Sequence, residues 1–222
     1  MDTIHLNKNS CHEIIPFDAI EQLASLTVNF LLEKTVAISG GKTYSSLFPF
    51  WVKLKPDCSQ TTFFPVDERI VPFDDPQSNW GTAYKYFLQL IGNAQDRNNF
   101  MTSPEMFRKI LFQKFNRNTP VFDVIFLGVG DDGHTASLFP NTSVFNYVSS
   151  IVLQTTSPKP PLDRITLAPK TLIQAKTLIT IIRGTEKKDI VKKIEQVDSS
   201  LPIVQILMQR SRSKIFIENI LL

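Results

Sequence analysis

The chain has 222 residues, of which 42% are hydrophobic and 20% are charged, and its formal net charge at pH 7 is +3. This balance suits one globular domain over residues 1–222 and excludes a strongly basic nucleic-acid-binding tail, while a pI of about 8.8 suits a small anionic substrate. Cys11 and Cys58 are too few for a disulfide framework or a cysteine-based zinc site, and no secretory signal or membrane-spanning run is predicted, so we expect a cytoplasmic protein that binds neither nucleic acid nor membranes.

The first half of the chain is predicted to alternate helices with strands. Apolar residues recur at steps of three and four over residues 17–32, which predicts an amphipathic helix. Residues 35–39 (TVAIS) are β-branched and apolar and lead into Gly40 and Gly41, which predicts a buried strand followed by a tight turn. A second strand is expected at 61–66, ending near Pro65, and further helices are expected at 46–54, 79–90 and 104–115.

The second half begins with the strongest predicted strand, residues 121–129 (VFDVIFLGV), which is apolar on both faces apart from Asp123. Such a run is typical of a central parallel strand that is covered on both sides. Further strands are expected at 149–153, 164–167, 177–184, 203–207 and 214–218, with a charged helix at 186–197. Strands that alternate with helices predict a single-domain α/β fold with a mostly parallel, twisted sheet and helices on both faces.

Ligands of open α/β sheets bind outside the carboxyl ends of the strands, and three predicted strand ends carry polar clusters. The first cluster is residues 39–48 (SGGKTYSSLF), where two glycines precede the start of a helix. Backbone N–H groups and the helix N-terminus can cradle an anion there, and Lys42 adds a full positive charge. The alternative is a plain strand-to-helix turn with a solvated lysine. The glycine spacing is not that of a Walker loop, so ATP binding is not predicted.

The second cluster is Asp67, Glu68 and Arg69, which follow the strand expected at 61–66. Because neighbouring side chains alternate in direction near a strand end, Asp67 and Arg69 are expected to face one side together and Glu68 the other. The alternative is a solvated loop. Asn79 is a candidate cap for the helix that follows.

The third cluster, residues 128–137 (GVGDDGHTAS), holds three glycines, two aspartates and His134, the only histidine outside the first dozen residues. A helix is expected to start at Thr135, and its dipole would keep the imidazole neutral and usable as a base. Asp132 is placed to orient the ring. The alternative is that His134 only packs at the turn. Arg164 and Lys187 also lie near predicted strand ends, where each is either solvated or part of an anion site.

Five segments occur in the order found in 6-phosphogluconolactonases, and the chain resembles this family over about residues 35–188. The segments are SGGKT (39–43), FFPVDERIVPFDDPQSNWG (63–81), FDVIFLGVGDDGHTASLFP (122–140), RITLAP (164–169) and RGTEKK (183–188). The resemblance implies a Rossmann-like sheet without a metal or organic cofactor. It also implies hydrolysis of 6-phospho-D-glucono-1,5-lactone to 6-phosphogluconate in the oxidative pentose phosphate pathway. We expect the phosphorylated sugar lactone as the partner, and a monomer or weak homodimer.

Carried over position by position, the resemblance implies that His134 is the general base, with Asp132, Asp67 and Arg69 as the other catalytic positions. Substrate-binding positions are implied at Ser39, Gly40, Gly41, Lys42, Thr43, Gly133, Thr135, Arg164 and Lys187. The chain departs from the family's usual Ser-Gly-Gly-Ser-Thr-Pro loop at Lys42 and Tyr44, and it has Glu218 where an aspartate is commoner.

Two other functions are weighed against this one. Glucosamine-6-phosphate deaminases resemble the family and share a Gly-x-Asp-Gly-His turn, but they usually follow it with an Ala-Phe-Asn-Glu segment whose glutamate supports an acid–base relay. Here Ser137, Leu138 and Phe139 follow instead, which favours the lactonase. A non-catalytic sugar-phosphate-binding protein is the second alternative, and the intact DER and GDDGHTAS clusters argue against it.

Overall fold

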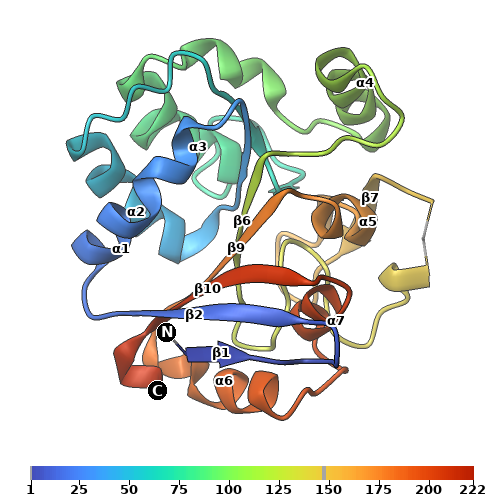
Figure 1. Ribbon diagram of the computed structural model, residues 1–222. Coiled ribbons are helices and arrows are strands. Elements are labelled where there is room, and N and C mark those ends of the chain that lie inside the picture. The colour runs from blue at the N-terminus through green and yellow to red at the C-terminus, as the bar shows by residue number, and fades with distance from the viewer. Residues whose placement is uncertain (1, 147–148) are drawn as a thin grey trace.

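The computed structural model describes residues 2–146 and 149–222, and a seven-stranded sheet with helices on both faces forms its centre (Figure 1). All neighbouring strands are parallel except the first pair, which is antiparallel. In spatial order the strands are β1 (Asp2–Ile4), β2 (Cys11–Phe17), β10 (Arg212–Glu218), β9 (Thr177–Ile182), β6 (Val124–Gly128), β3 (Thr35–Ile38) and β4 (Thr62–Pro65). The predicted α/β fold with a mostly parallel sheet is therefore confirmed.

Helices cover both faces of this sheet and bury an apolar cluster on each. One face is covered by α1 (Ile20–Thr27), α2 (Gly41–Lys53) and α3 (Asn79–Tyr86). The other is covered by α4 (Pro104–Phe115), α5 (Pro169–Ile173), α6 (Lys188–Glu195) and α7 (Pro202–Met208). Shorter 3-10 helices lie at η1 (Val28–Leu32), η2 (Leu88–Ile91), η3 (Ala94–Asn99), η4 (Val144–Asn146), η5 (Thr185–Lys187) and η6 (Asn219–Leu221).

Strand β6 lies between β3 and β9, as its sequence predicts for a central strand. Val124 and Phe126 pack into the cluster under α1, α2 and α3, whereas Ile125 and Leu127 pack into the cluster on the opposite face. This alternation explains why the run is apolar throughout, since a parallel strand covered on both sides has no face for polar side chains. The residues that follow β6 therefore start from the middle of the sheet edge.

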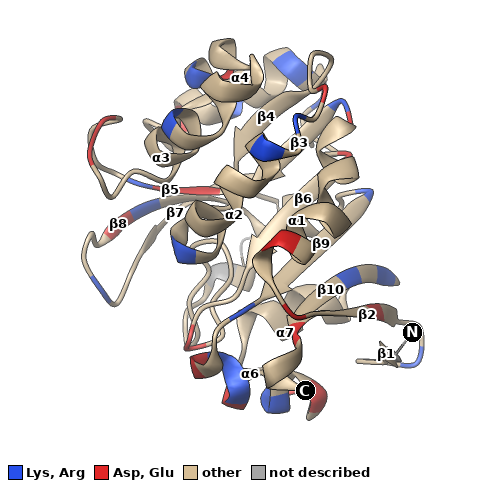
Figure 2. Ribbon diagram, turned by 90° about the vertical axis from the view of Figure 1, so that its left-hand side faces the viewer, with Lys and Arg blue, Asp and Glu red and all other residues tan. Residues whose placement is uncertain are grey.

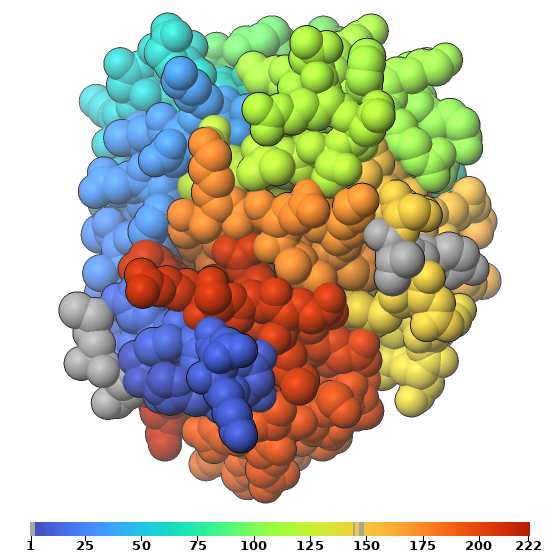
Figure 3. All heavy atoms as spheres, turned by 45° about the vertical axis from the view of Figure 1, so that its right-hand side comes forward, coloured from blue at the N-terminus to red at the C-terminus, as the bar shows by residue number. Residues whose placement is uncertain are grey.

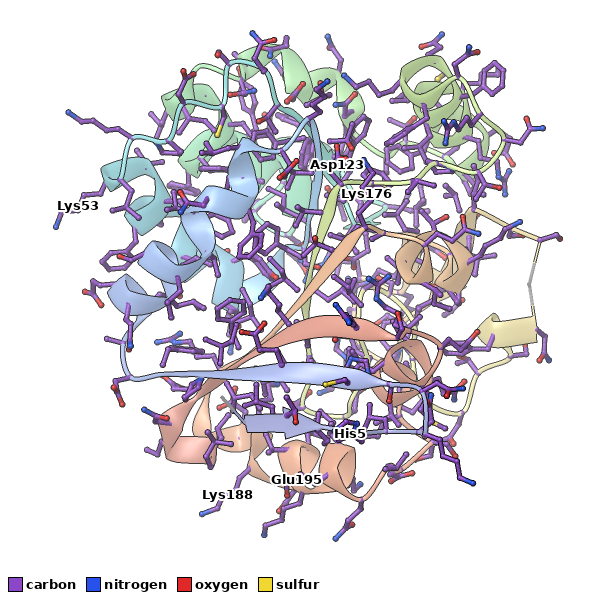
Figure 4. All side chains as sticks on the ribbon, in the orientation of Figure 1. His5, Lys53, Asp123, Lys176, Lys188 and Glu195 are labelled. Atoms are coloured by element: carbon purple, nitrogen blue, oxygen red, sulfur yellow. The ribbon has the colours of Figure 1, made fainter. Side chains whose placement is uncertain are left out.

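Asp123 is the polar exception in this run, and it lies just before β6 at the end opposite to the pocket described below. Its carboxylate accepts hydrogen bonds from the backbone N–H and the hydroxyl of Thr35, at 3.0 and 2.7 Å. The ammonium of Lys176 lies 2.6 Å from the other carboxylate oxygen (Figure 4). Burial opposes ionisation, but these bonds outweigh it and lower the pKa of Asp123. The residue thus ties together the starts of three neighbouring strands.

A second, antiparallel sheet stands beside the first, in the order β5 (Asp67–Arg69), β8 (Asp163–Leu167) and β7 (Val152–Thr156). Figure 2 shows β5 and β8 side by side, with acidic positions on β5 and a basic position on β8. The sequence indicated strands near β7 and β8 but not that they form a separate sheet. This sheet holds one wall of the pocket described below, because Asp67, Arg69 and Arg164 line it.

The structure differs from the predicted secondary structure in several places. Residues 203–207 are part of helix α7 and not a strand. Pro202 has the fixed φ and missing N–H that suit a first helical turn, and nearly every side of this short helix is buried, so its sequence shows no helical period. The helix predicted at 17–32 forms from Ile20 onward, as α1 followed by the 3-10 helix η1, whereas Phe17 ends β2. Strands β1 and β2 were not predicted. β2 extends the sheet by pairing in parallel with β10, and Figure 3 shows this N-terminal segment against the C-terminal strand.

Several other boundaries shift without changing the element. Helix α2 begins at Gly41, directly after the glycine turn, and the charged helix near residue 186 is a 3-10 turn followed by α6. Each described helix is too short or too polar to cross a membrane.

Candidate active site

A pocket of about 520 Å³ lies over the carboxyl ends of β3, β6 and β9 and reaches the second sheet. It contains every predicted site residue except Gly133 and Thr135. Positive side chains lining it are Lys42, Arg69, Lys159, Arg164, Arg183 and Lys187. Carboxylates lining it are Asp67, Asp131, Asp132 and Glu186. A pocket with this surplus of positive side chains suits an anionic ligand.

The turn from β3 into α2 forms one wall. The hydroxyl of Ser39 donates to the carbonyl of Phe126 at 2.9 Å, which ties the turn to the central strand. Gly40 lies against the side chain of Asn79, and a Cβ at Gly40 would stand 2.1 Å from its Oδ1. Within the described chain no side chain caps α2, so its first N–H groups are left for a ligand beside the exposed Lys42. Uncapped helix starts of this kind are typical of anion-binding sites.

Strand β5 presents Asp67 and Arg69 to the pocket and turns Glu68 away from it, as the alternation along a strand requires. One oxygen of Asp67 accepts a hydrogen bond from the hydroxyl of Ser137 at 2.6 Å. The Nη1 group of Arg69 donates to the carbonyl of Gln77 at 2.6 Å. A carboxylate and a guanidinium are thereby fixed on the same wall.

Glu68 is fully buried and organises the start of α3. It accepts hydrogen bonds from the backbone N–H groups of Arg69, Asn79 and Trp80, all at 2.7 Å, and from the hydroxyl of Ser78 at 3.0 Å. Burial raises the pKa of Glu68 to about 7 even though these four donors oppose the shift. The network sets the position of Asn79, whose side-chain amide donates to the carbonyl of Asp67 and lines the pocket.

Asn79 was the candidate N-cap of α3 from the sequence, but the structure shows a different residue there. Ser78 is the N-cap, because its hydroxyl accepts from the N–H of Gly81 at 2.9 Å. The side chain of Asn79 is left to face the pocket and was not predicted to do so.

His134 follows β6 and is held by Asp132. Its Nδ1 lies 2.5 Å from Oδ1 of Asp132, and its backbone N–H donates to the same oxygen at 3.0 Å. Burial alone would raise the pKa of Asp132, but these bonds and the charge of the histidine outweigh it and lower the pKa to about 2. An ionised carboxylate only accepts, so Nδ1 carries the proton and Nε2 is the basic nitrogen. A Cβ at Gly130 would stand 2.1 Å from Nδ1, so this close approach requires glycine.

The helix expected at Thr135 does not form, so the argument from a helix dipole was wrong. The chain instead makes a compact turn in which the N–H of Gly130 donates to the carbonyl of His134 at 2.8 Å. The hydroxyl of Thr135 is buried and donates to the carbonyl of Gly128 at 2.8 Å. The carbonyl of Gly133 accepts from the N–H of Ile203. These contacts place Gly133 and Thr135 in the framework of the turn, outside the pocket lining.

Arg164 stands opposite Arg69 across the β5 and β8 pair. Its Nε donates to the carbonyl of Pro161 at 2.8 Å, so the guanidinium also holds the loop between β7 and β8. Burial, and then the positive charge of Arg69, lower the pKa of Arg164. A bound anion near both guanidinium groups would relieve this repulsion.

The pocket residues that were not predicted from the sequence include Asn79, Lys159 and Arg183. Arg183 directly follows β9, so the rule that ligands lie at strand ends was sufficient to find it. Lys159 lies in the proline-rich loop, with its ammonium 3.7 Å from Asp131. The residues around Lys159 show no pattern from which a place in the pocket could be predicted. Among the described residues, no group of histidine, cysteine and acidic side chains could hold a metal ion.

The parallel sheet, the glycine turn with free N–H groups and the histidine held by a carboxylate are together typical of an α/β enzyme whose site lies at the carboxyl ends of the strands. The family model of glucosamine-6-phosphate isomerases/6-phosphogluconolactonase matches residues 18–216, and the chain belongs to this family. It is 33% identical to 6-phosphogluconolactonase 4 of Saccharomyces cerevisiae, over 89% of this chain and 86% of that protein. It is 34% identical to a probable 6-phosphogluconolactonase of Schizosaccharomyces pombe, over 76% and 74%. The solved 6-phosphogluconolactonase of Trypanosoma cruzi is 25% identical, covers 97% of this chain and 98% of its own, and superposes with a TM-score of 0.78.

Proposed function

We propose that this chain hydrolyses 6-phospho-D-glucono-1,5-lactone to 6-phospho-D-gluconate, the second step of the oxidative pentose phosphate pathway. The observation that carries the proposal is the Asp132 and His134 pair inside a pocket lined by positive side chains, in a chain related to 6-phosphogluconolactonases over most of its length. The pocket suits a phosphorylated sugar, and the histidine suits the opening of an ester.

The mechanism begins with the phosphate bound by the turn after β3 and by positive side chains that line the pocket. Nε2 of His134 accepts a proton from water as the water oxygen bonds to the lactone carbonyl carbon. The resulting oxyanion is met by backbone N–H groups or by the guanidinium of Arg69. The carbonyl then reforms, the bond to the ring oxygen breaks, and that oxygen takes the proton back from His134 or from solvent. Asp132 keeps Nδ1 protonated throughout, so Nε2 remains the nitrogen that can accept the proton.

The direct test is a coupled assay in which 6-phosphogluconate is oxidised as it forms from freshly generated lactone. The rate is corrected for spontaneous opening, measured with heat-inactivated protein. We expect a rate that is proportional to protein concentration and saturates with lactone. A corrected rate of zero with folded protein, combined with binding of 6-phosphogluconate, would instead favour the non-catalytic sugar-phosphate-binding protein.

The deaminase alternative needs a second acid–base group after the histidine turn. Ser137 is buried there with its hydroxyl on Asp67, Leu138 is fully buried, and the next carboxylate along the chain, Asp163, is exposed and outside the pocket lining. We therefore expect no ammonia release from glucosamine 6-phosphate. Release of ammonia at a rate above that of lactone hydrolysis would reverse the assignment.

We also propose that the protein is cytoplasmic, forms one domain and works as a monomer or weak homodimer. Two apolar clusters on either side of one sheet support a single cooperative unit. Light scattering after size exclusion is expected to give the mass of one chain, rising toward two only at high concentration. A stable larger assembly would contradict this expectation.

A further inference from the structure

Arg183 is a pocket residue to which the sequence assigned no role, and it is held by a carboxylate from the next strand. It directly follows β9, and its Nε lies 3.4 Å from Oε1 of Glu218 at the end of β10. The other oxygen of Glu218 accepts from the N–H of Gly184 at 2.8 Å. Strands β9 and β10 are parallel with Ile182 opposite Ile217, so both ends lie at the same edge of the sheet. Glu218 therefore accepts a hydrogen bond from the turn after β9 and forms an ion pair, without a hydrogen bond, with the guanidinium that follows the strand.

This ion pair leaves the outer part of the guanidinium free to bind a ligand. The Nε atom is buried, while a third of the side chain (33%) is exposed and lines the pocket. Among the described residues, neither Nη group of Arg183 makes a hydrogen bond to protein. By contrast, Arg164 donates to Pro161 and Arg69 donates to Gln77, so those two guanidinium groups are partly occupied. Arg183 thus offers two unoccupied Nη groups in one plane.

The neighbouring charges show which kind of ligand suits this end of the pocket. Lys187, one turn further along the chain, also lines the pocket, and its side chain is only 12% exposed. Its ammonium lies 3.9 Å from Glu186, a distance too long for a strong bond. A planar guanidinium and an ammonium that line the same pocket suit a phosphate ester, because the guanidinium can donate two parallel bonds to two phosphate oxygens.

We propose that Arg183, oriented by Glu218, binds the phosphate of the substrate together with Lys187, and so selects phosphorylated over unphosphorylated lactones. This inference rests on the proposed function for the identity of the substrate. It adds Arg183 as a binding residue and Glu218 as a positioning residue at the β9 end. Glu218 acts through the ion pair with Arg183 and does not itself contact substrate.

The test compares Arg183→Ala with Lys188→Ala, which removes the same charge from a nearby residue. Lys188 is exposed, lies outside the pocket lining and points away from the sheet (Figure 4). For Arg183→Ala we expect KM for the phosphorylated lactone to rise about 10- to 100-fold, since hydrogen bonds to charged groups contribute about 1.5–3 kcal/mol. We expect kcat to change less than about twofold, because this phosphate contact is the same in the ground and transition states. Lys188→Ala is expected to leave both constants unchanged.

A second substrate separates phosphate binding from a merely structural role. Hydrolysis of unphosphorylated glucono-1,5-lactone is expected to have the same kcat/KM in Arg183→Ala and wild type. An equal loss on both lactones, or an unchanged KM for the phosphorylated one, overturns the proposal. Glu218→Gln keeps the shape of the side chain but removes the charge that holds Arg183. This variant is expected to raise KM for the phosphorylated lactone alone. An unchanged KM, in a variant that unfolds like wild type, would show that Glu218 does not position Arg183.

Titration calorimetry with inorganic phosphate measures the phosphate site independently of lactone hydrolysis. Weaker phosphate binding by Arg183→Ala than by Lys188→Ala supports the site even if the wild-type chain shows no lactone hydrolysis. Full lactonase activity combined with equal phosphate binding by both variants supports the function and overturns the site.

Discussion

Replacing His12 with asparagine is expected to change how the stability of the fold depends on pH. His12 is fully buried in β2, and its Nδ1 lies 2.7 Å from the hydroxyl of Ser213 in β10. Burial, and then the positive charge of Arg210, lower the pKa of His12 from 6.5 to about 4. Asparagine places an amide near the Ser213 hydroxyl, but this amide does not become protonated as the pH falls. The variant therefore isolates the titration of one side chain.

The sign of the effect follows from proton binding. Below pH 6.5 the unfolded chain protonates His12 while the folded chain does not, so stability is lost as the pH falls toward 4. The two pKa values give a loss from this one residue of about 2 kcal/mol at pH 5 and about 3 kcal/mol at pH 4. Glu68 and Asp96 act in the opposite direction, because burial raises their pKa values to about 7 and about 6. The pH dependence of wild-type stability is the sum of all these contributions. The contribution of His12 is therefore obtained from the difference in unfolding free energy between wild type and His12→Asn.

Urea unfolding at pH 7, 6, 5 and 4 measures this difference. Trp51 and Trp80 are both buried, so their fluorescence reports the transition. The free energy of unfolding of wild type is expected to fall relative to His12→Asn by about 3 kcal/mol between pH 7 and pH 4. Parallel losses in the two proteins would refute the reasoning, since they would show that His12 does not titrate differently on unfolding.

Three further substitutions test the framework of the pocket. Gly130→Ala places a Cβ on the imidazole of His134 and is expected to lower kcat at least about tenfold without unfolding the chain, as measured in the lactone assay with circular dichroism as the control. Asp132→Asn presents an amide N–H to Nδ1 and is expected to lower kcat about 10- to 100-fold by disturbing the tautomer, while the Kd for 6-phosphogluconate stays constant. Glu68→Gln turns an N–H toward the buried donors of Ser78 and Asn79 and is expected to lower the free energy of unfolding by about 1–3 kcal/mol in urea. Unchanged values would contradict each assignment.

The elements predicted correctly from the sequence are those whose local residue pattern fits only one kind of structure. Residues 121–129 are apolar on both faces, and only a covered central strand accounts for such a run. Eleven of the thirteen predicted site residues line the pocket, and polar side chains directly after an apolar strand have few structural reasons to be there. The alternation along β5 separated Asp67 and Arg69 from Glu68 for the same physical reason, the two-residue period of a strand.

The parts that the sequence missed depend on contacts between distant segments. Helix α7 is buried on nearly all sides, so its apolar residues show no period. Strand β2 becomes a strand by pairing with β10, at the other end of the chain. The pairing of Glu218 with Arg183 and the packing of Asn79 against Gly40 are likewise invisible until the chain is folded. Local patterns predict elements, whereas these positions are set by tertiary packing.

The turnover of His134→Ala tests the central claim most directly. The measurement is kcat on freshly generated 6-phosphogluconolactone, with the Kd for 6-phosphogluconate determined on the same preparation. A general base contributes about 10²- to 10⁴-fold, so we expect kcat to fall by that factor while Kd changes little. A variant that hydrolyses the lactone at nearly the wild-type rate would contradict the account, because the imidazole held by Asp132 would then take no part in the reaction.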